Sequence, residues 1–181
     1  MKKIHLLFFF LFFASFFSSC NDDSNPFNGN DQLPAITQTG VNTVGCLVNG
    51  KVFLPKQEGI NPPVNCFYQL VDGEFYFSLA FSDLRGSTNK TVNIFTSKIQ
   101  LEVGVDYILN KPDDPSLYGA GGEYRLGQAD QYNTNNVKIG LLKLSKIDLQ
   151  NSIISGTFWF DAINSNGEVV EIREGRFDWN Y

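Results

Sequence analysis

The sequence predicts an all-β fold, either an antiparallel β-sandwich or a flattened barrel of about nine or ten strands. Three observations predict it. Apolar and polar residues alternate with a period of two, Asn-Gly and Asp-Gly pairs separate neighbouring segments, and no pattern with a period of 3.6 residues extends beyond one turn. Strands joined by short turns pair antiparallel and form a sandwich or a barrel. The pattern leaves the choice between these two open.

The first half of the predicted domain contains two hairpins. Asn49-Gly50 separates the apolar runs 46–48 and 51–54, and Asp72-Gly73 separates 65–71 from 74–82. Both residues of such turns tolerate positive φ, which makes these pairs the strongest short-range hairpin signal.

Alternation shows which face of the strand at 74–82 is buried. Four apolar side chains share one face: Phe75, Phe77, Leu79 and Phe81. Further strands are expected at 92–96, 99–101 and 105–109, and the composition of residues 110–122 indicates a loop.

The second half ends in the longest predicted hairpin. Residues 123–126 and 137–147 are expected to be extended, and the turn 164–167 joins strand 153–163 to strand 168–178. In the first of these two strands, Ile154, Phe158, Phe160 and Ala162 alternate with Thr157, Trp159, Asp161 and Ile163. In the second, Val170 and Ile172 alternate with Glu171 and Arg173.

Residues 1–19 have the composition of a secretory signal peptide. Lys2 and Lys3 precede an apolar run of about 14 residues, and small residues follow it. The run is shorter than the ~20 residues that cross a bilayer as a helix. A retained anchoring helix is the alternative.

Cys20 follows the small residues directly, and this arrangement resembles the lipobox of bacterial lipoproteins. The resemblance implies cleavage before Cys20, a lipid on that cysteine and attachment to the membrane. Residues 20–42 are then a lipid-anchored flexible tether, and residues 43–181 form one domain. The acidic residues after Cys20 resemble the export tag of Bacteroidetes-type surface lipoproteins; a plain solvated tether is the alternative.

Cys46 and Cys66 are the two cysteines left after lipidation. An even pair in an oxidising compartment favours a disulfide, with two free buried thiols as the alternative.

Two motifs carry a family resemblance. Residues 43–53, TVGCLVNGKVF, and the ending ISGTFWF followed by EGRFD within 153–178 are similar to the opening and ending of Bacteroidetes lipoproteins of unknown function. The resemblance implies an all-β, lipid-anchored domain outside the cytoplasm, in the outer membrane and facing the periplasm or the cell surface. It implies no activity.

Composition excludes several classes of function. The single histidine, His5, lies in the leader, so the rest of the chain holds no Ser-His-Asp triad, no Cys-His pair and no histidine-ligated metal. Removing residues 1–19 takes away Lys2 and Lys3 but no acid, which shifts the net charge from −5 to −7. An acidic chain without basic clusters is a poor nucleic-acid binder. We expect no cofactor and no catalytic residue.

Carboxylates supply the remaining candidates for chemistry. Asp161, Glu171 and Glu174 lie on the last hairpin and could form a glycosidase acid pair, or simply a solvated charge ladder. Asp113-Asp114 with Asp130 could bind Ca²⁺, although their spacing does not match the twelve-residue calcium loop, and solvation of a loop is the alternative. Gly119–Gly122 neither follows a strand nor opens a helix, which argues against a phosphate cradle.

Aromatic side chains near loops or on outward faces are the better indication of function. Trp159, Tyr124, Tyr132 and Asn135 are the candidate ligand-binding residues, because rings pack against the apolar faces of sugars and amides hydrogen-bond their hydroxyls. The alternative is that the aromatic residues cover a sheet or a barrel rim, a reading that extends to Tyr118, Trp179 and Tyr181.

These observations favour a non-enzymatic binding or interaction module of the cell envelope. A surface glycan-binding accessory protein, a structural partner within an outer-membrane complex and a carboxylate-dependent glycoside hydrolase are the alternatives.

Overall fold

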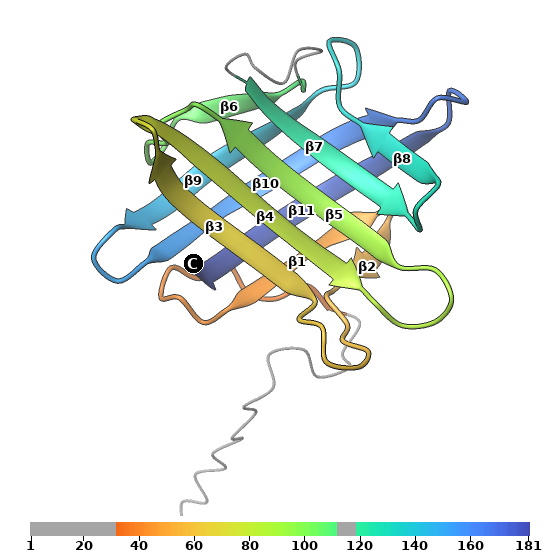
Figure 1. Ribbon diagram of the computed structural model, residues 1–181, viewed down its shortest axis with the longest axis horizontal. Coiled ribbons are helices and arrows are strands. Elements are labelled where there is room, and N and C mark those ends of the chain that lie inside the picture. The colour runs from red at the N-terminus through yellow and green to blue at the C-terminus, as the bar shows by residue number, and fades with distance from the viewer. Residues whose placement is uncertain (1–31, 112–118) are drawn as a thin grey trace, which may run out of the picture.

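The computed structural model describes residues 32–111 and 119–181, and in these ranges the chain is built from eleven strands and no helix (Figure 1). The strands are β1 Thr43–Val48, β2 Lys51–Phe53, β3 Val64–Val71, β4 Glu74–Asp83, β5 Lys90–Ser97, β6 Asp106–Leu109, β7 Gly119–Leu126, β8 Asp130–Asn133, β9 Gly140–Asp148, β10 Ile153–Ile163 and β11 Val169–Asn180. The predicted all-β class is confirmed. The described residues contain no helix that is long and apolar enough to cross a membrane.

All the strands belong to one antiparallel sheet that folds into two layers. The front layer in Figure 1 has the order β7-β5-β4-β3, and the back layer crosses behind it with the order β2-β1-β11-β10-β9-β6. Strand β8 joins the layers, because it pairs with β7 along its length and with β10 at one position. The sheet does not close into a barrel, which resolves the choice in favour of a sandwich-like fold.

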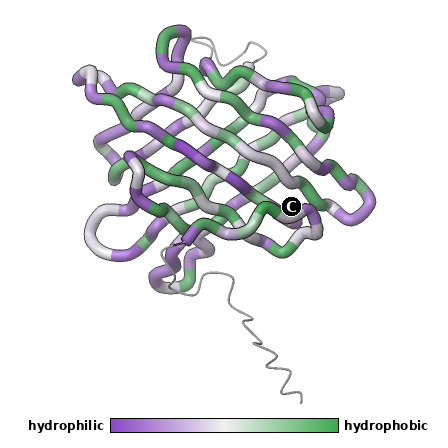
Figure 2. The backbone as a smooth tube through the Cα atoms, turned by 180° about the vertical axis from the view of Figure 1, so that it is seen from behind, coloured by the Kyte–Doolittle hydropathy of each residue, from purple (hydrophilic) through white to green (hydrophobic). Residues whose placement is uncertain are grey.

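The core lies between the two layers and is made by one face of each strand. In β4, Phe77, Leu79 and Phe81 are buried, as the alternation predicts. Figure 2 shows the same alternation as hydrophobic and hydrophilic positions that follow one another along the strands. Removal of this apolar surface from water, at about 25 cal/mol per Å², is the main force that holds the layers together.

Both predicted two-residue turns are confirmed. Asn49 and Gly50 have φ of 48° and 77°, and Asp72 and Gly73 have φ of 51° and 85°. Positive φ at both central residues is the geometry of the type I′ turn, whose twist matches that of the flanking strands.

The predicted loop 110–122 is wrong at its end, because residues from Gly119 onward begin β7. Its glycines are covered from both faces. A Cβ on Gly121 would lie 2.5 Å from the ring of Phe95, and one on Gly122 would lie 2.6 Å from the ring of Phe160. Glycine is needed in this strand because aromatic rings from other strands occupy the space of its side chains.

Two further differences concern short segments. Strand β8 was not predicted, because its four residues are polar and show no apolar alternation. Residues 99–101 form no strand; instead the N–H of the buried Leu101 donates to the Tyr68 hydroxyl at 3.0 Å.

Residues 32–42, the described part of the predicted tether, lie against the domain. The carboxylate of Asp178 accepts hydrogen bonds from the Thr37 hydroxyl at 2.7 Å and from the N–H groups of Thr39 at 2.9 Å and Gly40 at 2.8 Å. It also accepts one from the Ser155 hydroxyl at 2.7 Å. We call residues 32–42 the N-terminal strap; its contacts differ from those expected of a flexible tether. Residues 1–31, with the predicted leader and Cys20, lie outside the described residues.

The predicted disulfide between Cys46 and Cys66 is not formed; both are free thiols. Cys46 is fully buried on β1 in the back layer, whereas Cys66 lies on β3, the edge strand of the front layer. A separation of twenty residues permits a bridge but does not tell which layer each strand joins. Burial raises the pKa of both thiols, that of Cys66 to about 12.

Candidate functional site

A row of side chains crosses five strands on the outer face of the back layer. The register places Ile108 of β6 opposite Leu141 of β9, and Leu141 opposite Trp159 of β10. The guanidinium of Arg173 on β11 lies 5.5 Å from the indole centroid, and Arg173 is opposite Leu47 of β1. Residues directly opposite one another on antiparallel strands point the same way, so these five side chains form one outer row.

The outer row is accessible and mostly apolar. Ile108 is 50% exposed and Trp159 is 38% exposed. Clustered apolar side chains on one face are a mark of binding surfaces, whereas scattered ones are ordinary.

Ion pairs border the outer row on both sides. Lys143 Nζ lies 2.9 Å from Asp106 Oδ1 on one side, and Arg173 Nη2 lies 2.6 Å from Asp161 Oδ1 on the other. The face therefore offers an apolar strip between polar margins.

A β-bulge in β11 shapes the centre of this face. The register of β11 gains one residue relative to both neighbours, and Glu174 has φ of +52°. The bulge inverts the alternation: Ile172 points inward before it, and Gly175 and Phe177 point inward after it. Bulges often lie beside binding and active sites, where they redirect side chains.

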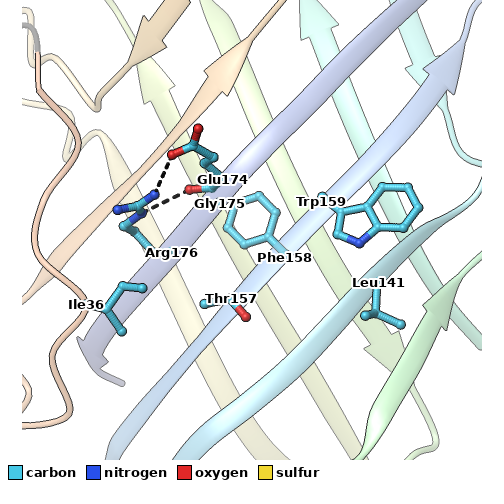
Figure 3. Close-up of a pocket in the computed structure, with 8 residues that line it drawn as sticks. All are labelled: Ile36, Leu141, Thr157, Phe158, Trp159, Glu174, Gly175 and Arg176. Carbon is cyan, nitrogen blue, oxygen red and sulfur yellow. Dashed lines mark hydrogen bonds and ion pairs between the residues drawn. The ribbon is translucent and has the colours of Figure 1, made fainter. Parts of the chain in front are cut away.

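A depression of about 270 Å³ lies next to Trp159 (Figure 3). Trp159 and Leu141 border it on one side, and Ile36 of the N-terminal strap lies across from them. The ion pair between Glu174 and Arg176, 2.9 Å between Oε2 and Nη2, stands at its rim. The remaining lining residues are Thr157, Phe158 and Gly175. The site thus combines an aromatic wall with charged hydrogen-bonding groups, the composition typical of small ligand sites.

Arg173 is held in place by a dense set of contacts. Its Nη1 donates to the carbonyl oxygens of Phe160 at 3.1 Å and Ile172 at 2.9 Å. Its Nη2 lies 2.6 Å from Asp161 and 3.7 Å from Glu171. The guanidinium over the indole face favours this orientation of Trp159.

The candidate acid pair fits the charge-ladder alternative. Asp161 and Glu171 are directly opposite each other, as their alternation predicts, but Arg173 contacts both carboxylates. Glu174 lies beyond the bulge and pairs with Arg176 instead.

The four predicted ligand-binding residues do not form one site. Trp159 lies on the outer face of the back layer. Tyr124 and Tyr132 are opposite each other on β7 and β8, with ring centroids 5.8 Å apart. Asn135 Oδ1 accepts from the N–H groups of Val137 and Lys138 and closes a turn.

Other predicted positions have structural surroundings or lie outside the described residues. Trp179 and Tyr181 pack against the core, and the Tyr181 ring lies edge-on to Tyr68. Tyr118 and the calcium candidates Asp113 and Asp114 are not among the described residues. Within the described ranges, no group of three or more His, Cys, Asp or Glu side chains could hold a metal ion.

A second polar cluster surrounds Glu123, which is only 5% exposed. Its carboxylate lies 3.6 Å from Lys111 Nζ and 3.1 Å from Arg125 Nη2, and it accepts a hydrogen bond from Gln131. The two cations and the amide compensate the buried charge, as a structural carboxylate requires.

The residues missed by sequence reasoning are those brought to Trp159 by register. Leu141 and Arg173 belong to neighbouring strands, and Ile36 comes from the N-terminal strap. Alternation identifies Trp159 as outward-facing, but it carries no information about which strand lies beside it.

The fold and this face define a class of protein: a two-layer, all-β domain with an aromatic depression on the outer face of one layer. Within this class, the chain belongs to the family described as a domain of unknown function (DUF6252), which it matches over residues 83–178. The match runs from the end of β4 to β11 and includes the motif at 153–178, but not the opening at 43–53. No curated protein and no solved structure matches the chain.

Proposed function

We propose that the protein is a non-enzymatic binding module of the cell envelope, attached to the outer membrane through a lipid on Cys20, whose binding face is the outer row with the Trp159 depression. The observation that carries the proposal is the continuity of this row: Trp159, 38% exposed, lies in a row of five side chains from five strands, four of them apolar and the fifth Arg173, between ion pairs. A surface of this kind serves recognition without any group that transfers a proton or attacks a bond.

The envelope location rests on the leader and on Cys20. We expect incorporation of a labelled fatty acid into the wild-type protein and its loss in Cys20→Ala. Cys66→Ala is the matched control, because it removes a different thiol. Labelling that persists in Cys20→Ala would remove the lipid anchor from the proposal. Protease treatment of intact cells then distinguishes the cell surface from the periplasmic face.

The non-enzymatic part rests on the contacts of the candidate acids. Arg173 contacts both Asp161 and Glu171, so neither carboxylate stands free to protonate a leaving group. A screen of glycoside substrates with the purified protein should find no turnover. Turnover that disappears in Glu171→Gln and in Asp161→Asn would contradict this part of the proposal.

A glycan is the ligand that the depression favours. The indole of Trp159 offers a flat apolar surface, and Thr157, Glu174 and Arg176 place hydroxyl, carboxylate and guanidinium groups beside it. Sugars present the same combination of apolar ring faces and hydroxyls.

A glycan array tests this second candidate. We expect binding by wild type, a loss of at least tenfold in Trp159→Ala, and wild-type binding in Leu70→Ala. The control removes an exposed apolar side chain from the front layer, where Leu70 is 58% exposed. Binding that is equal in all three proteins, or absent from all, would count against glycan capture at this face.

A further inference from the structure

A second pocket, of about 340 Å³, lies at the end of the molecule where the two layers meet. The β1–β2 hairpin of the back layer forms one wall, with Asn49 and Lys51 among its lining residues. The end of β4 and the start of β5 form the other wall, and Figure 1 shows these strand ends at the same end of the molecule as β2. The pocket is therefore separate from the depression at Trp159, which lies on an outer face.

Apolar and aromatic side chains line the pocket as well. Val48 and Phe53 line it, and Tyr124 reaches it from β7. Phe53 and Tyr124 are each 8% exposed, so both are held in the core. Ligand sites for small molecules start at about 300 Å³ and combine apolar walls with a few polar groups.

The charges around the pocket do not cancel. Asp83 is the only acid among its lining residues, and both of its carboxylate oxygens bond to Arg85, at 3.0 Å from Nε and 3.0 Å from Nη2. Lys51 and Lys90 also line the pocket, and neither lies within ion-pair distance of a carboxylate among the described residues. Lys90 is opposite Asp83 in the strand register, and its charge helps to lower the pKa of that carboxyl. The lining side chains thus carry two positive charges against the single negative charge of Asp83, which Arg85 also neutralises, in a chain whose net charge is −5.

We propose that this interlayer pocket binds a small organic anion, a carboxylate or a phosphate monoester attached to an apolar or aromatic group. The anion lies between Lys51 and Lys90, the apolar part packs against Val48 and Phe53, and the Tyr124 hydroxyl supplies a hydrogen bond. A surplus of positive charge beside an apolar cavity favours an anion over a neutral molecule of the same shape.

Titration of the purified protein with four matched probes tests the proposal: benzoate, phenyl phosphate, benzamide and benzylamine. We expect at least one of the two anions to bind, and benzamide and benzylamine to bind at least tenfold more weakly. The anion that binds more tightly shows whether the pocket prefers a carboxylate or a phosphate. The affinity should fall as salt is added, because salt screens the lysine charges.

Two charge-removing variants locate the site. Lys51→Gln/Lys90→Gln should lower the affinity for the better anion at least tenfold. Lys143→Gln/Lys146→Gln removes the same charge from β9, where both lysines pair with aspartates, and should bind like wild type. Tyr124→Phe keeps the ring in the core and should weaken binding while the unfolding midpoint stays close to that of wild type.

Three results would overturn the proposal: no binding of either anion at millimolar concentration, equal affinity for the better anion and benzamide, or unchanged affinity for the better anion in folded Lys51→Gln/Lys90→Gln. None of them concerns Trp159, so failure here leaves the proposed function standing.

Discussion

At the residue scale, one carboxylate connects the N-terminal strap to the last strand. Asp178 is 1% exposed and accepts hydrogen bonds from Thr37, Thr39, Gly40 and Ser155. Burial alone would raise its pKa, but the hydrogen bonds outweigh this effect, and the pKa lies below its usual value. The ionised carboxylate is therefore a structural group that holds one border of the Trp159 depression in place.

Asp178→Asn should lower the free energy of unfolding by about 1–3 kcal/mol at pH 7, because an amide cannot accept all of these hydrogen bonds. Since the folded pKa is lowered, the stabilisation is present above the unfolded pKa of about 3.9 and is lost as pH falls through the folded pKa. The difference between wild type and Asp178→Asn in urea unfolding should therefore shrink below about pH 4. Asp106→Asn, at an exposed ion pair, is the control. A difference that stays constant down to the lowest pH at which the protein folds would contradict this role.

At the element scale, the bulge in β11 decides which side chains reach the outer face. Without the extra residue, the alternation that buries Ile172 would continue, and Phe177 would point outward. The bulge puts Glu174 in the left-handed region, which costs a non-glycine residue roughly 1–2 kcal/mol.

Glu174→Gly should be more stable than Glu174→Ala by about 1 kcal/mol, since glycine adopts positive φ without a Cβ clash. Both variants lose the same exposed ion pair with Arg176, so the comparison isolates the backbone. Chemical denaturation measures the difference. An alanine variant as stable as the glycine variant would show that the bulge carries no such strain.

At the scale of the whole molecule, sequence predicts the class, most strands and their buried faces, because alternation and turn residues are local. It does not predict what depends on contacts between distant elements. Gly121 and Gly122 read as a loop in the sequence, because nothing local shows that the rings of Phe95 and Phe160 lie over them in a strand. The alternation along β11 places Asp178 on the outward face, but the N-terminal strap covers it. Likewise, the sequence predicts Trp159 as a ligand-binding residue, but the residues that lie beside it depend on strand pairing, which the sequence does not show.

The two-layer arrangement also predicts the chemistry of the cysteines. Cys46 and Cys66 should both stay unmodified when the native protein is treated with iodoacetamide near neutral pH, because burial raises the pKa of both thiols and leaves little thiolate. Both should react after denaturation without a reductant, as mass spectrometry would show. A disulfide between the peptide that contains Cys46 and the peptide that contains Cys66 in that sample would contradict the free-thiol structure.

The central claim is that ligands bind at the outer row, and the two tryptophans provide the most direct measurement. Trp159 is 38% exposed on that row, whereas Trp179 packs against the core. Their indole N–H resonances, assigned with Trp159→Phe, should be followed while the glycans bound on the array are added. We predict that the Trp159 signal shifts and saturates while the Trp179 signal stays in place. A Trp159 signal that does not move under saturating ligand would contradict the claim.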